Sequence, residues 1–591
     1  MSLLSYLSEI LYEEIKKCGY TLKSADKLVT ISGRPDLSQF QSNFAMQIAK
    51  EYGKNPRDIA LDVAEMLKDN KIFSKVSIDG PGFLNIDLTD EFLVDFVSKI
   101  YNEKNFGIKS NSKKRIVIDY GGANIAKPLH VGHLRSAIIG EGLKRLAILL
   151  GDEVIGDVHL GDWGRQMGMI ISEIKKRKPD LVYFDEDYMG EYPSESPVTI
   201  DELEEIYPKA SADAKNDENR MEEAREATAI LQDSDRKGHR GYYALWQQLV
   251  KVSVSDLKSI YDRLDVHFEL WKGESDCYEF IPGMIKTLEE NKFTFNSDGT
   301  LIMDVKQEGD TTDIPPLILK TKNGTFGYDA TELATMLDRV NSYNPDEIWY
   351  VVDKRQALHF EQSFRAAYKS GIVPTTTKMS FFGFGTMNGK DGRPFKTRDG
   401  GVMKLVDLLQ QVKDYEKDIL SKNDNLTDEE IDSISEIVSQ GCIKYADAIS
   451  NRETDYIFDI DKFTNVNGKT GAYVLYSTVR ANSILNKAKE MNYNINGSLV
   501  APSSEAERRL MLSISKVNDV VRNAYNCKSL NIIAEYLFEI SSLYNAFYNS
   551  YRILTESDEV KRESWLKLSY ITRQLNEMLL NCLVISIPEK I

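Results

Sequence analysis

The sequence predicts an α/β protein in which a parallel β-sheet forms the catalytic domain, between a small N-terminal α+β domain and a C-terminal all-α helical bundle. Strand-like and helix-like segments alternate through the middle of the chain, and apolar residues recur at helical spacing through its last third. Near the start, Gly80, Pro81 and Gly82 separate two segments that alternate apolar and polar residues, as in a β-hairpin. A chain of 591 residues also needs more than one hydrophobic core.

The first domain is predicted over residues 1–108. Its hairpin is expected at 75–88, and the stretch 101–114, rich in Asn, Lys and Ser, is expected to be a linker. Amphipathic helices are expected at 2–17, 38–52 and 56–69.

The catalytic domain is predicted over residues 109–401. A strand rich in β-branched residues at 115–120 leads into a helix at 131–150, and a second strand at 153–160 leads into another helix. This order favours a Rossmann-like parallel sheet, of the kind that binds nucleotides. Further buried strands of this pattern are expected at 317–319, 348–352 and 379–385.

A polar, charge-rich insertion interrupts the pattern at about 183–240, and we interpret it as a solvated helical hairpin. Residues 402–591 are predicted to form the helical bundle. Its helices are expected at 404–419, 427–450, 470–490, 505–525, 529–550 and 560–580.

Composition narrows the class of protein. The five cysteines are scattered without a CxxC pair, which predicts neither zinc nor disulfides and fits a reducing, cytoplasmic location. The chain has no apolar run long enough for a membrane span, and its first residues lack the basic start of a signal peptide. The net charge of −17 argues against general binding to polyanions, so any contact with RNA must use a local surface.

The most informative residues are His130 and His133, two of only six histidines, on either side of Gly132 where a strand turns into a helix. Residues three apart share a helix face, and the N-terminus of a helix favours a phosphate. Each imidazole can donate a hydrogen bond to a phosphate oxygen, and Gly132 would let a flat base lie against the backbone. The alternative is a pair of ordinary polar residues at a helix start.

The segment Lys390–Gly401 carries four cations between glycines. Such a loop is suited to closing over a triphosphate. The alternative is a plain basic surface loop.

Together these motifs resemble the class I aminoacyl-tRNA synthetases, and in particular the arginyl-tRNA synthetase family, over essentially the whole chain. Leu129–His133 matches the class I signature, and the wider block Ala123–Ser136 looks like the arginine enzymes. Other segments similar to that family are Asp36–Asn43, Gly80–Phe83, Gly161–Gly164, Phe395–Arg398 and Gly471–Arg480.

The resemblance implies ATP-dependent attachment of L-arginine to tRNA(Arg) through arginyl-adenylate, with release of pyrophosphate and AMP. Mg²⁺ would accompany the nucleotide without a dedicated protein ligand. No zinc is expected. The catalytic residues implied are Lys127, His130, His133, Lys396 and Arg398. The ATP-binding residues implied are Ala123, Asn124, His130, Gly132, His133, Gly161, Asp162 and Lys396.

The second class I signature, Lys-Met-Ser-Lys-Ser, is degraded in this chain. Lys378–Ser380 looks like its beginning but runs into an apolar strand, so we interpret it as a decoy. The loop that covers ATP is expected at Phe395–Arg398, and the resemblance implies that Lys127 supplies the missing charge.

Recognition of arginine needs carboxylates, because a guanidinium pairs bidentately with Asp or Glu. Glu332 is one methylene longer than the aspartate usual in the family, so Asp329 remains an alternative holder of the guanidinium. By position, the resemblance assigns the arginine pocket to Asp119, Asn124, Tyr328, Glu332 and Gln356.

Contacts with tRNA are expected from exposed aromatic and polar side chains, because aromatic rings stack on unpaired bases. Tyr473 and Tyr476 have an alternative, which is packing within the bundle. The resemblance points to Phe40, Gln41 and Asn43 in the first domain and to Tyr473, Tyr476 and Arg480 in the bundle.

Three other classes of protein compete with this interpretation. A different ATP-dependent nucleotidyltransferase would not need the flanking domains, and several synthetases of other specificity would carry a zinc motif or a large editing insertion. A non-catalytic RNA-binding relative would not need intact His130, His133 and Lys396. We therefore expect a cytoplasmic, monomeric enzyme.

Overall fold

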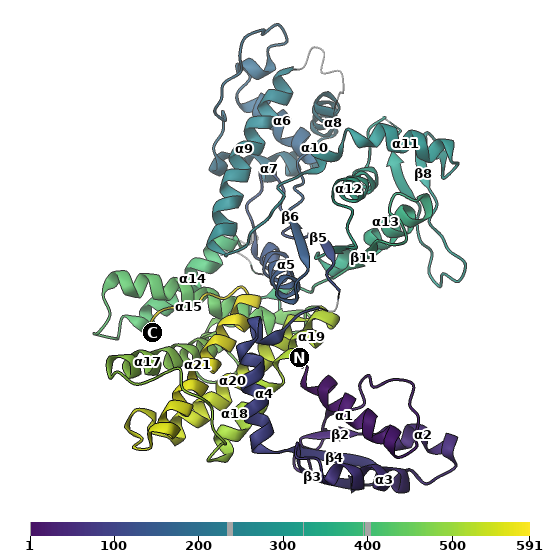
Figure 1. Cartoon of the computed structure of the whole chain (residues 1–591). Coiled ribbons are helices and arrows are strands. Elements are labelled where there is room, and N and C mark those ends of the chain that lie inside the picture. Colours follow the sequence, from purple (N-terminus) through teal and green to yellow (C-terminus); the bar gives the residue numbers. More distant parts are fainter. Residues whose placement is uncertain (1, 111, 233–239, 323, 394, 396–402) are drawn as a thin grey trace. The chain divides into compact units, whose positions relative to one another are not determined.

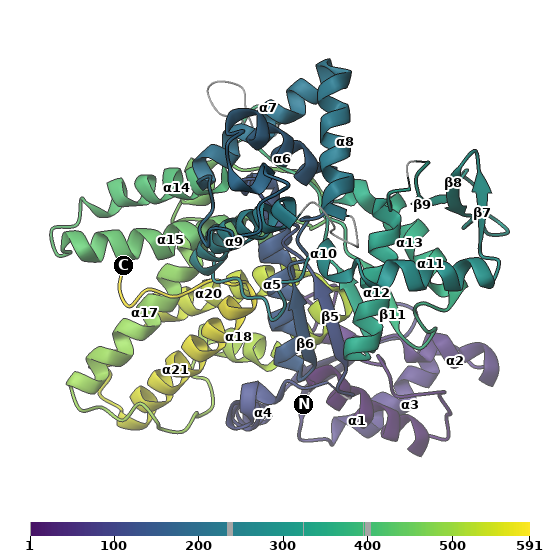
Figure 2. The same ribbon diagram turned by 90° about the horizontal axis from the view of Figure 1, so that it is seen from above.

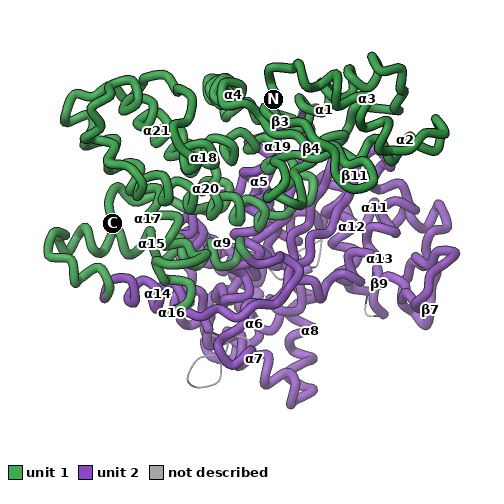
Figure 3. The backbone as a smooth tube through the Cα atoms, turned by 90° about the horizontal axis from the view of Figure 1, so that it is seen from below, with its two compact units in different colours: residues 1–110, 419–449, 461–591 green, residues 111–418, 450–460 purple. Residues whose placement is uncertain are grey.

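The computed structural model describes residues 2–110, 112–232, 240–322, 324–393, 395 and 403–591 (Figures 1 and 2). The backbone divides into two compact units, coloured separately in Figure 3. Unit 1 comprises Met1–Ser110, Ile419–Ile449 and Asp461–Ile591, and unit 2 comprises Asn111–Asp418 and Ser450–Ile460. The two ends of the chain therefore share one unit, and the middle of the chain forms the other.

Unit 2 is built on a parallel sheet, as the sequence predicts, and its four strands have the order β11-β10-β5-β6. The register pairs Asp119 with Asp157 on one side and with Tyr350 on the other, so three strands end at the same level. The strands are β5 (Arg115–Asp119), β6 (Glu153–Asp157), β10 (Glu347–Tyr350) and β11 (Lys378–Phe381).

Helix α5 (Val131–Leu150) runs beside β5 and β6 in both views and has the predicted bounds (Figures 1 and 2). It ends at Gly151, whose φ of +100° is the left-handed conformation that glycine adopts most easily. At Gly140 a Cβ atom would lie 2.3 Å from the ring of Tyr120, so this glycine lets the helix lie directly on the end of β5. Ser136 adds a polar link, because its hydroxyl donates to the carbonyl of Val351 at 2.7 Å.

The strand predicted at 317–319 exists as β9 (Leu317–Lys320), but it does not join the parallel sheet. It pairs with β8 (Thr300–Met303), which pairs with β7 (Thr294–Ser297), in a separate antiparallel sheet. Leu317 and Leu319 are buried while Ile318 is 47% exposed, so the strand buries one face, whereas a strand in the parallel sheet would bury two.

The insertion is a helical hairpin, as predicted, of α7 (Ile200–Asn216) and α8 (Glu218–Gln232). Small side chains on its inner face, Ala210, Ala214 and Ala224, pack with Met169 of α6 (Arg165–Arg177). The hairpin is therefore attached to the parallel-sheet unit through an apolar face as well as being solvated.

In unit 1, the small domain contains the predicted hairpin of β3 (Phe73–Asp79) and β4 (Phe83–Leu88), within an antiparallel sheet of order β1-β2-β4-β3. The helix predicted at 38–52 is wrong in its first part, because Phe40–Ser42 forms β2 and pairs with β4. The other elements of this domain are α1 (Leu3–Lys17), β1 (Thr30–Ile31), α2 (Phe44–Tyr52), α3 (Pro56–Lys68) and α4 (Asp90–Asn102).

The bundle in unit 1 follows the helices predicted from residue 427 onward closely, except that the helix expected at 505–525 is two helices joined at Lys516. The helix expected at 404–419 is α14 (Leu405–Leu420), and all but its last two residues belong to unit 2. Among the helices of the described ranges, none combines the length and the apolar character that crossing a membrane requires. The bundle helices are α15 (Asp428–Ala448), α17 (Gly471–Glu490), α18 (Glu505–Ser515), α19 (Val517–Cys527), α20 (Leu530–Ser550) and α21 (Glu559–Cys582).

Candidate active site

The two histidines cap the start of α5 reciprocally. The Nδ1 of His130 accepts the backbone N–H of Gly132 at 3.0 Å, and the Nδ1 of His133 accepts the N–H of His130 at 3.0 Å. An imidazole whose Nδ1 accepts carries its proton on Nε2, so each neutral ring keeps Nε2–H as a donor. The rings lie 3.9 Å apart between centroids, so the two donors belong to one small region.

Gly132 is required by this capping geometry. A Cβ atom there would lie 2.8 Å from Cε1 of the His130 ring. Any other residue would push the imidazole away from the position in which it caps the helix, which gives the glycine a role besides the one expected from the sequence.

Both imidazoles are neutral at physiological pH. Burial, together with the neighbouring His130 and Lys127, lowers the pKa of His133 to about 3. Burial, with the charges of Lys127 and Arg355, also lowers the pKa of His130. The Nζ of Lys127 lies 4.3 Å from the ring centroid of Tyr207, which belongs to the insertion.

The segment predicted to close over ATP is only partly described, because Lys396 and Arg398 lie outside the described residues. Its flanking residues are described, and they lie beside the histidine motif. The N–H of Met403 donates to the carbonyl of Phe395 at 3.2 Å, and the N–H of Val131 donates to the carbonyl of Met403 at 3.3 Å. Lys378–Ser380 forms part of β11, as its interpretation as a decoy requires.

Asn124 and Gly161 lie side by side where β5 and β6 continue into loops. The N–H of Gly161 donates to the carbonyl of Ala123 at 3.0 Å, and a Cβ atom at Gly161 would lie 2.2 Å from Oδ1 of Asn124. Asp162 is buried, and its two carboxylate oxygens accept from the N–H and hydroxyl of Ser275 at 3.0 and 2.6 Å. These contacts hold Asp162 inside the fold, so its predicted binding of ATP stays a prediction.

Helix α12 (Tyr328–Tyr343) presents Tyr328 and Glu332 one turn apart. Oε1 of Glu332 is buried and has no hydrogen-bond partner among the described residues. Asp329, by contrast, accepts the N–H of Ile318 at 2.7 Å and lies 3.4 Å from Nδ1 of His359. Glu332 is therefore the carboxylate with capacity for a ligand.

Glu274 is a second buried acid of this site that sequence reasoning missed. It is the first residue of α10 (Glu274–Cys277), and burial, with the nearby carboxylates of Asp162 and Glu332, raises its pKa to about 7. The one sequence signal was its place after Gly273 at a helix start, which is too common to single out a residue. Its importance appears only when the fold places it beside Glu332.

A cavity of about 770 Å³ opens beside Glu274. Asn124, Gly161, Glu274 and Tyr328 line it, and Tyr328 is 68% exposed. The insertion closes another side of the cavity with Tyr207, Glu222, Arg225 and Gln232.

Asp119, predicted for the arginine pocket, lies at the end of β5 and is held by an internal cation. Its Oδ2 is 2.6 Å from Nη2 of Arg339. Gln356, also predicted for this pocket, is exposed in the short helix η3 (Lys354–Gln356). Arg355 of the same helix acts on the pKa of His130, so η3 lies near the histidine pair.

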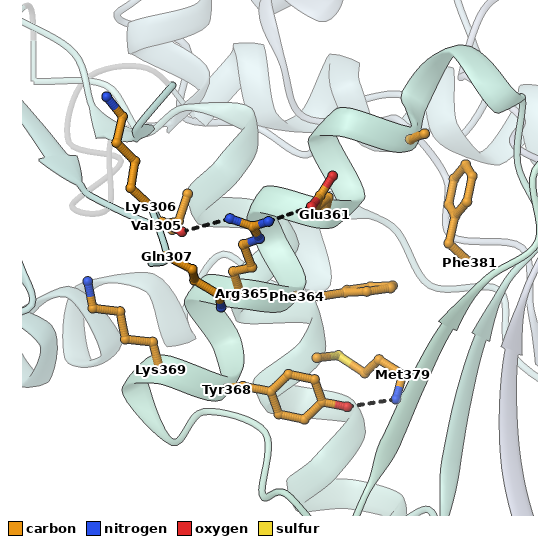
Figure 4. Close-up of a pocket in the computed structure, with 11 residues that line it drawn as sticks. Val305, Lys306, Gln307, Glu361, Phe364, Arg365, Tyr368, Lys369, Met379 and Phe381 are labelled. Carbon is orange, nitrogen blue, oxygen red and sulfur yellow. Dashed lines mark hydrogen bonds and ion pairs between the residues drawn. The ribbon is translucent and has the colours of Figure 1, made fainter. Parts of the chain in front are cut away.

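A second cavity, of about 900 Å³, lies between α13 (Ala357–Ser370), β11 and residues 305–307 (Figure 4). None of the predicted site residues lines it. Its Arg365 lies 2.8 Å from Asp310 and 2.6 Å from Glu361, so the charge of this guanidinium is already compensated. Figure 4 also shows the hydroxyl of Tyr368 accepting the N–H of Met379, at 2.9 Å.

The predicted tRNA contacts in unit 1 have mixed outcomes. The contact predicted for Phe40 is wrong. Side chains alternate along β2, and the ring of Phe40 points into the core, where it is fully buried. Gln41 is half-buried and Asn43 is exposed, so both can reach a ligand.

The three bundle residues are half-buried on one face of α17, toward α20. Tyr473 packs on Phe538 with ring centroids 5.2 Å apart. Nη1 of Arg480 donates to Oδ1 of Asn545 at 2.6 Å. These contacts match the alternative of packing within the bundle, and roles of Tyr473, Tyr476 and Arg480 in tRNA binding stay predictions.

Comparisons with known proteins identify the family of the chain. The family model for the catalytic domain of class I (R) tRNA synthetases matches residues 96–460, the DALR anticodon binding domain matches 474–591, and the arginyl tRNA synthetase N-terminal domain matches 5–88. The chain is 48% identical over 589 residues to an arginine–tRNA ligase of Alkaliphilus oremlandii, covering 100% of this chain and 99% of the relative. A corresponding ligase of Agathobacter rectalis is 45% identical over 599 residues, again covering 100% and 99%.

Among solved structures, the arginyl-tRNA synthetase of Plasmodium falciparum superposes with a TM-score of 0.80 at 26% identity, covering 100% of this chain and 99% of that one. A parallel sheet whose first crossover helix begins with this histidine pair, together with these matches, defines a class I aminoacyl-tRNA synthetase. More narrowly, the chain belongs to the arginyl-tRNA synthetase family.

Proposed function

We propose that the site joins L-arginine to ATP and then passes the arginyl group to tRNA(Arg), as the family's ligase activity implies. In the first step a carboxylate oxygen of arginine attacks the α-phosphorus of ATP. The bond from that phosphorus to the bridging oxygen breaks, which gives arginyl-adenylate and pyrophosphate. In the second step a hydroxyl of the terminal ribose of the tRNA attacks the arginyl carbonyl carbon, and AMP leaves.

The nucleotide phosphates are bound at the start of α5 in this proposal. The Nε2–H groups of His130 and His133 donate to phosphate oxygens, and both rings are neutral because their pKa values are lowered. Lys127 adds a positive charge next to them. Lys396 and Arg398, which lie outside the described residues, are proposed to add positive charge to this site, because Met403 just after their segment accepts the N–H of Val131.

Arginine is bound along α12 and α10. Glu332 and Glu274 hold the guanidinium in this proposal. Glu274 is a buried acid that lines the cavity, and Glu332 is near enough to raise the pKa of Glu274. Oε1 of Glu332 is buried and has no partner in the described part of the chain. Tyr328 and Asn124 line the same cavity and complete the pocket. Asp329 is excluded from this role in the proposal because Ile318 and His359 already use its carboxylate.

Mg²⁺ enters this proposal with the nucleotide, where it would shield phosphate charge. In the described ranges no three His, Cys, Asp or Glu side chains are grouped to hold a metal ion. The phosphate oxygens of ATP are therefore its proposed ligands. A cytoplasmic location and a monomeric state complete the proposal, and light scattering of the purified protein tests the second.

The observation that carries the proposal is the presence, in one unit, of two imidazoles at a helix start and of a buried oxygen of Glu332 that has no hydrogen-bond partner within the described ranges. The test is exchange of labelled pyrophosphate into ATP with each amino acid, with and without tRNA(Arg). We expect exchange with arginine, and only in the presence of the tRNA, as the family implies. Exchange that depends on another amino acid would overturn the assigned specificity.

A further inference from the structure

Arg339 is a completely buried cation that the steps above do not use. It lies on α12, with its side chain 1% exposed, and its Nη2 is 2.6 Å from Oδ2 of Asp119 and 2.7 Å from Oδ2 of Asp157. The guanidinium carbon lies 5.3 Å from the ring centroid of Tyr350. Since these three partners end β5, β6 and β10, Arg339 connects the ends of three neighbouring strands.

The position of Arg339 on its helix relates it to the arginine pocket. Glu332, Thr335 and Arg339 follow one another at spacings of three and four, which places them on one face of α12. Thr335 lies between the other two, and its hydroxyl is 3.2 Å from Nε2 of His159. The face of α12 that carries Glu332, the acid proposed to bind the substrate's guanidinium, therefore also carries the guanidinium of Arg339.

Arg339 also divides the acids of the site into two pairs. Asp119 and Asp157 contact Arg339, whereas Glu332 keeps an unpartnered oxygen among the described residues and Glu274 lines the cavity. Without Arg339, the two aspartates would be buried anions without a cation. They would offer a guanidinium or ammonium ligand a second place of similar chemistry, deeper than the first.

The contacts of Arg339 are incomplete for a purely structural residue. Its Nε and Nη1 are buried and have no hydrogen-bond partner in the described part of the chain, so a single nitrogen makes both ion pairs. A buried ion pair of this kind is weak evidence for a gain in stability, and a role in selecting one arrangement has to be tested separately.

We propose that Arg339 is a specificity-determining and positioning residue for arginine. It occupies the inner carboxylates, so that the substrate's guanidinium has only the place at Glu332 and Glu274. This inference rests on the arginine pocket proposed above.

The test is chemical rescue of Arg339→Ala by guanidinium ion at a low, non-denaturing concentration. We expect the variant to lose about 100-fold in kcat/KM for arginine in pyrophosphate exchange, and guanidinium, but not sodium or tetramethylammonium at equal ionic strength, to restore at least about tenfold. In the unsubstituted enzyme the same ion should compete with arginine instead. A folded Arg339→Ala variant with unchanged kinetics, or one that guanidinium does not rescue, would overturn the inference.

Two further variants keep the test decisive if Arg339→Ala does not fold. Arg339→Lys keeps the charge but loses the planar fork, so we expect a higher KM for arginine and a smaller preference for arginine over lysine. An unchanged KM and preference would contradict the proposal. Lys272→Ala is the matched control. It removes a different cation, whose Nζ lies 2.6 Å from Asp338 of α12, and we expect guanidinium not to change the activity of this variant.

These outcomes separate the inference from the proposed function. Competition by guanidinium in the unsubstituted enzyme tests the pocket of Glu332 and Glu274. Rescue tests Arg339 alone. Competition without rescue would leave the pocket supported and remove Arg339 from its role.

Discussion

The start of α5 and the inner face of α12 are two polar sites on the same sheet, built in different ways. At α5, the ring of His133 accepts the N–H of His130, and the ring of His130 accepts the N–H of Gly132, so the geometry of both donors is fixed within one turn of helix. At α12, the proposed arginine pocket combines Glu332 with Glu274 from α10, and the carboxylate of Asp119 at the end of β5 lies near Glu332. The first site is local in sequence, and the second exists only in the folded unit.

This difference predicts different failures. Changes at α5 should leave the arginine pocket intact and slow the chemical step, because its donors act on phosphates. Changes at α12 should weaken arginine binding and alter its pH dependence, because buried acids close to one another shift each other's pKa. The experiments below test this division, beginning with the largest expected effect.

Replacing His133 should give the largest loss. His133→Ala removes one Nε2–H donor and the acceptor for the N–H of His130, so we expect kcat for pyrophosphate exchange to fall about 10²–10³-fold. The KM for arginine should change little. Equal effects on kcat and on arginine binding would show that the two sites are not separable. His133→Asn is the control, since its amide can both accept and donate and should recover part of the rate.

Replacing Glu332 should affect binding instead. Glu332→Gln removes the charge opposite the guanidinium with little change of shape, so we expect the KM for arginine to rise about 100-fold, with a smaller change in kcat. Asp329→Asn changes an acid three residues before Glu332 on the same helix. It is the matched control and should raise the KM for arginine much less. A larger rise in KM for Asp329→Asn would move the guanidinium to that residue.

The pH dependence of arginine binding should come from Glu274. Because burial and nearby carboxylates raise its pKa to about 7, the side chain loses its charge as pH falls through that value. A neutral acid no longer attracts the guanidinium, so the KM for arginine should rise as pH falls below about 7, by up to tenfold per pH unit. Arginine binding near pH 7 should also release a proton, because the guanidinium favours the charged carboxylate.

Calorimetry in buffers of different ionisation enthalpy measures that proton release. Glu274→Gln should abolish both the release and the change in KM with pH near 7. Its KM should stay close to the value that the unsubstituted enzyme reaches at low pH, where Glu274 is neutral. If the pH dependence persists in this variant, another group titrates.

The same comparison explains what could be predicted from the sequence. The α5 site could be predicted because its residues lie close together in the sequence. Its strand, turn and helix follow local patterns, and the helix has the bounds that the sequence predicts. In the α12 site, Tyr328 and Glu332 were found through resemblance, but Glu274 was missed and Arg339 was not considered. Their significance depends on burial and on contacts between segments that are far apart in the chain.

Other differences have equally specific causes. Phe40 lies on a short strand within a stretch that has the apolar spacing of a helix, and only pairing with β4 shows that its ring is buried. At Leu317–Leu319 the apolar run looked buried on both faces, although Ile318 is exposed. In both cases the sheet, which is non-local, decides which face of the strand is covered.

The smallest effect among these experiments is expected at Lys127, which belongs to the α5 side of the comparison. Its Nζ lies over the ring of Tyr207 at 4.3 Å, and its charge contributes to the lowered pKa of both histidines. Lys127→Met should lower kcat about three- to tenfold, as expected for one partly exposed charge near phosphates, and leave the KM for arginine unchanged. Tyr207→Phe keeps the ring under the ammonium and should retain full activity, whereas Tyr207→Leu should reproduce part of the Lys127→Met loss. A loss of arginine affinity in Lys127→Met would place this lysine with the α12 site and break the proposed division.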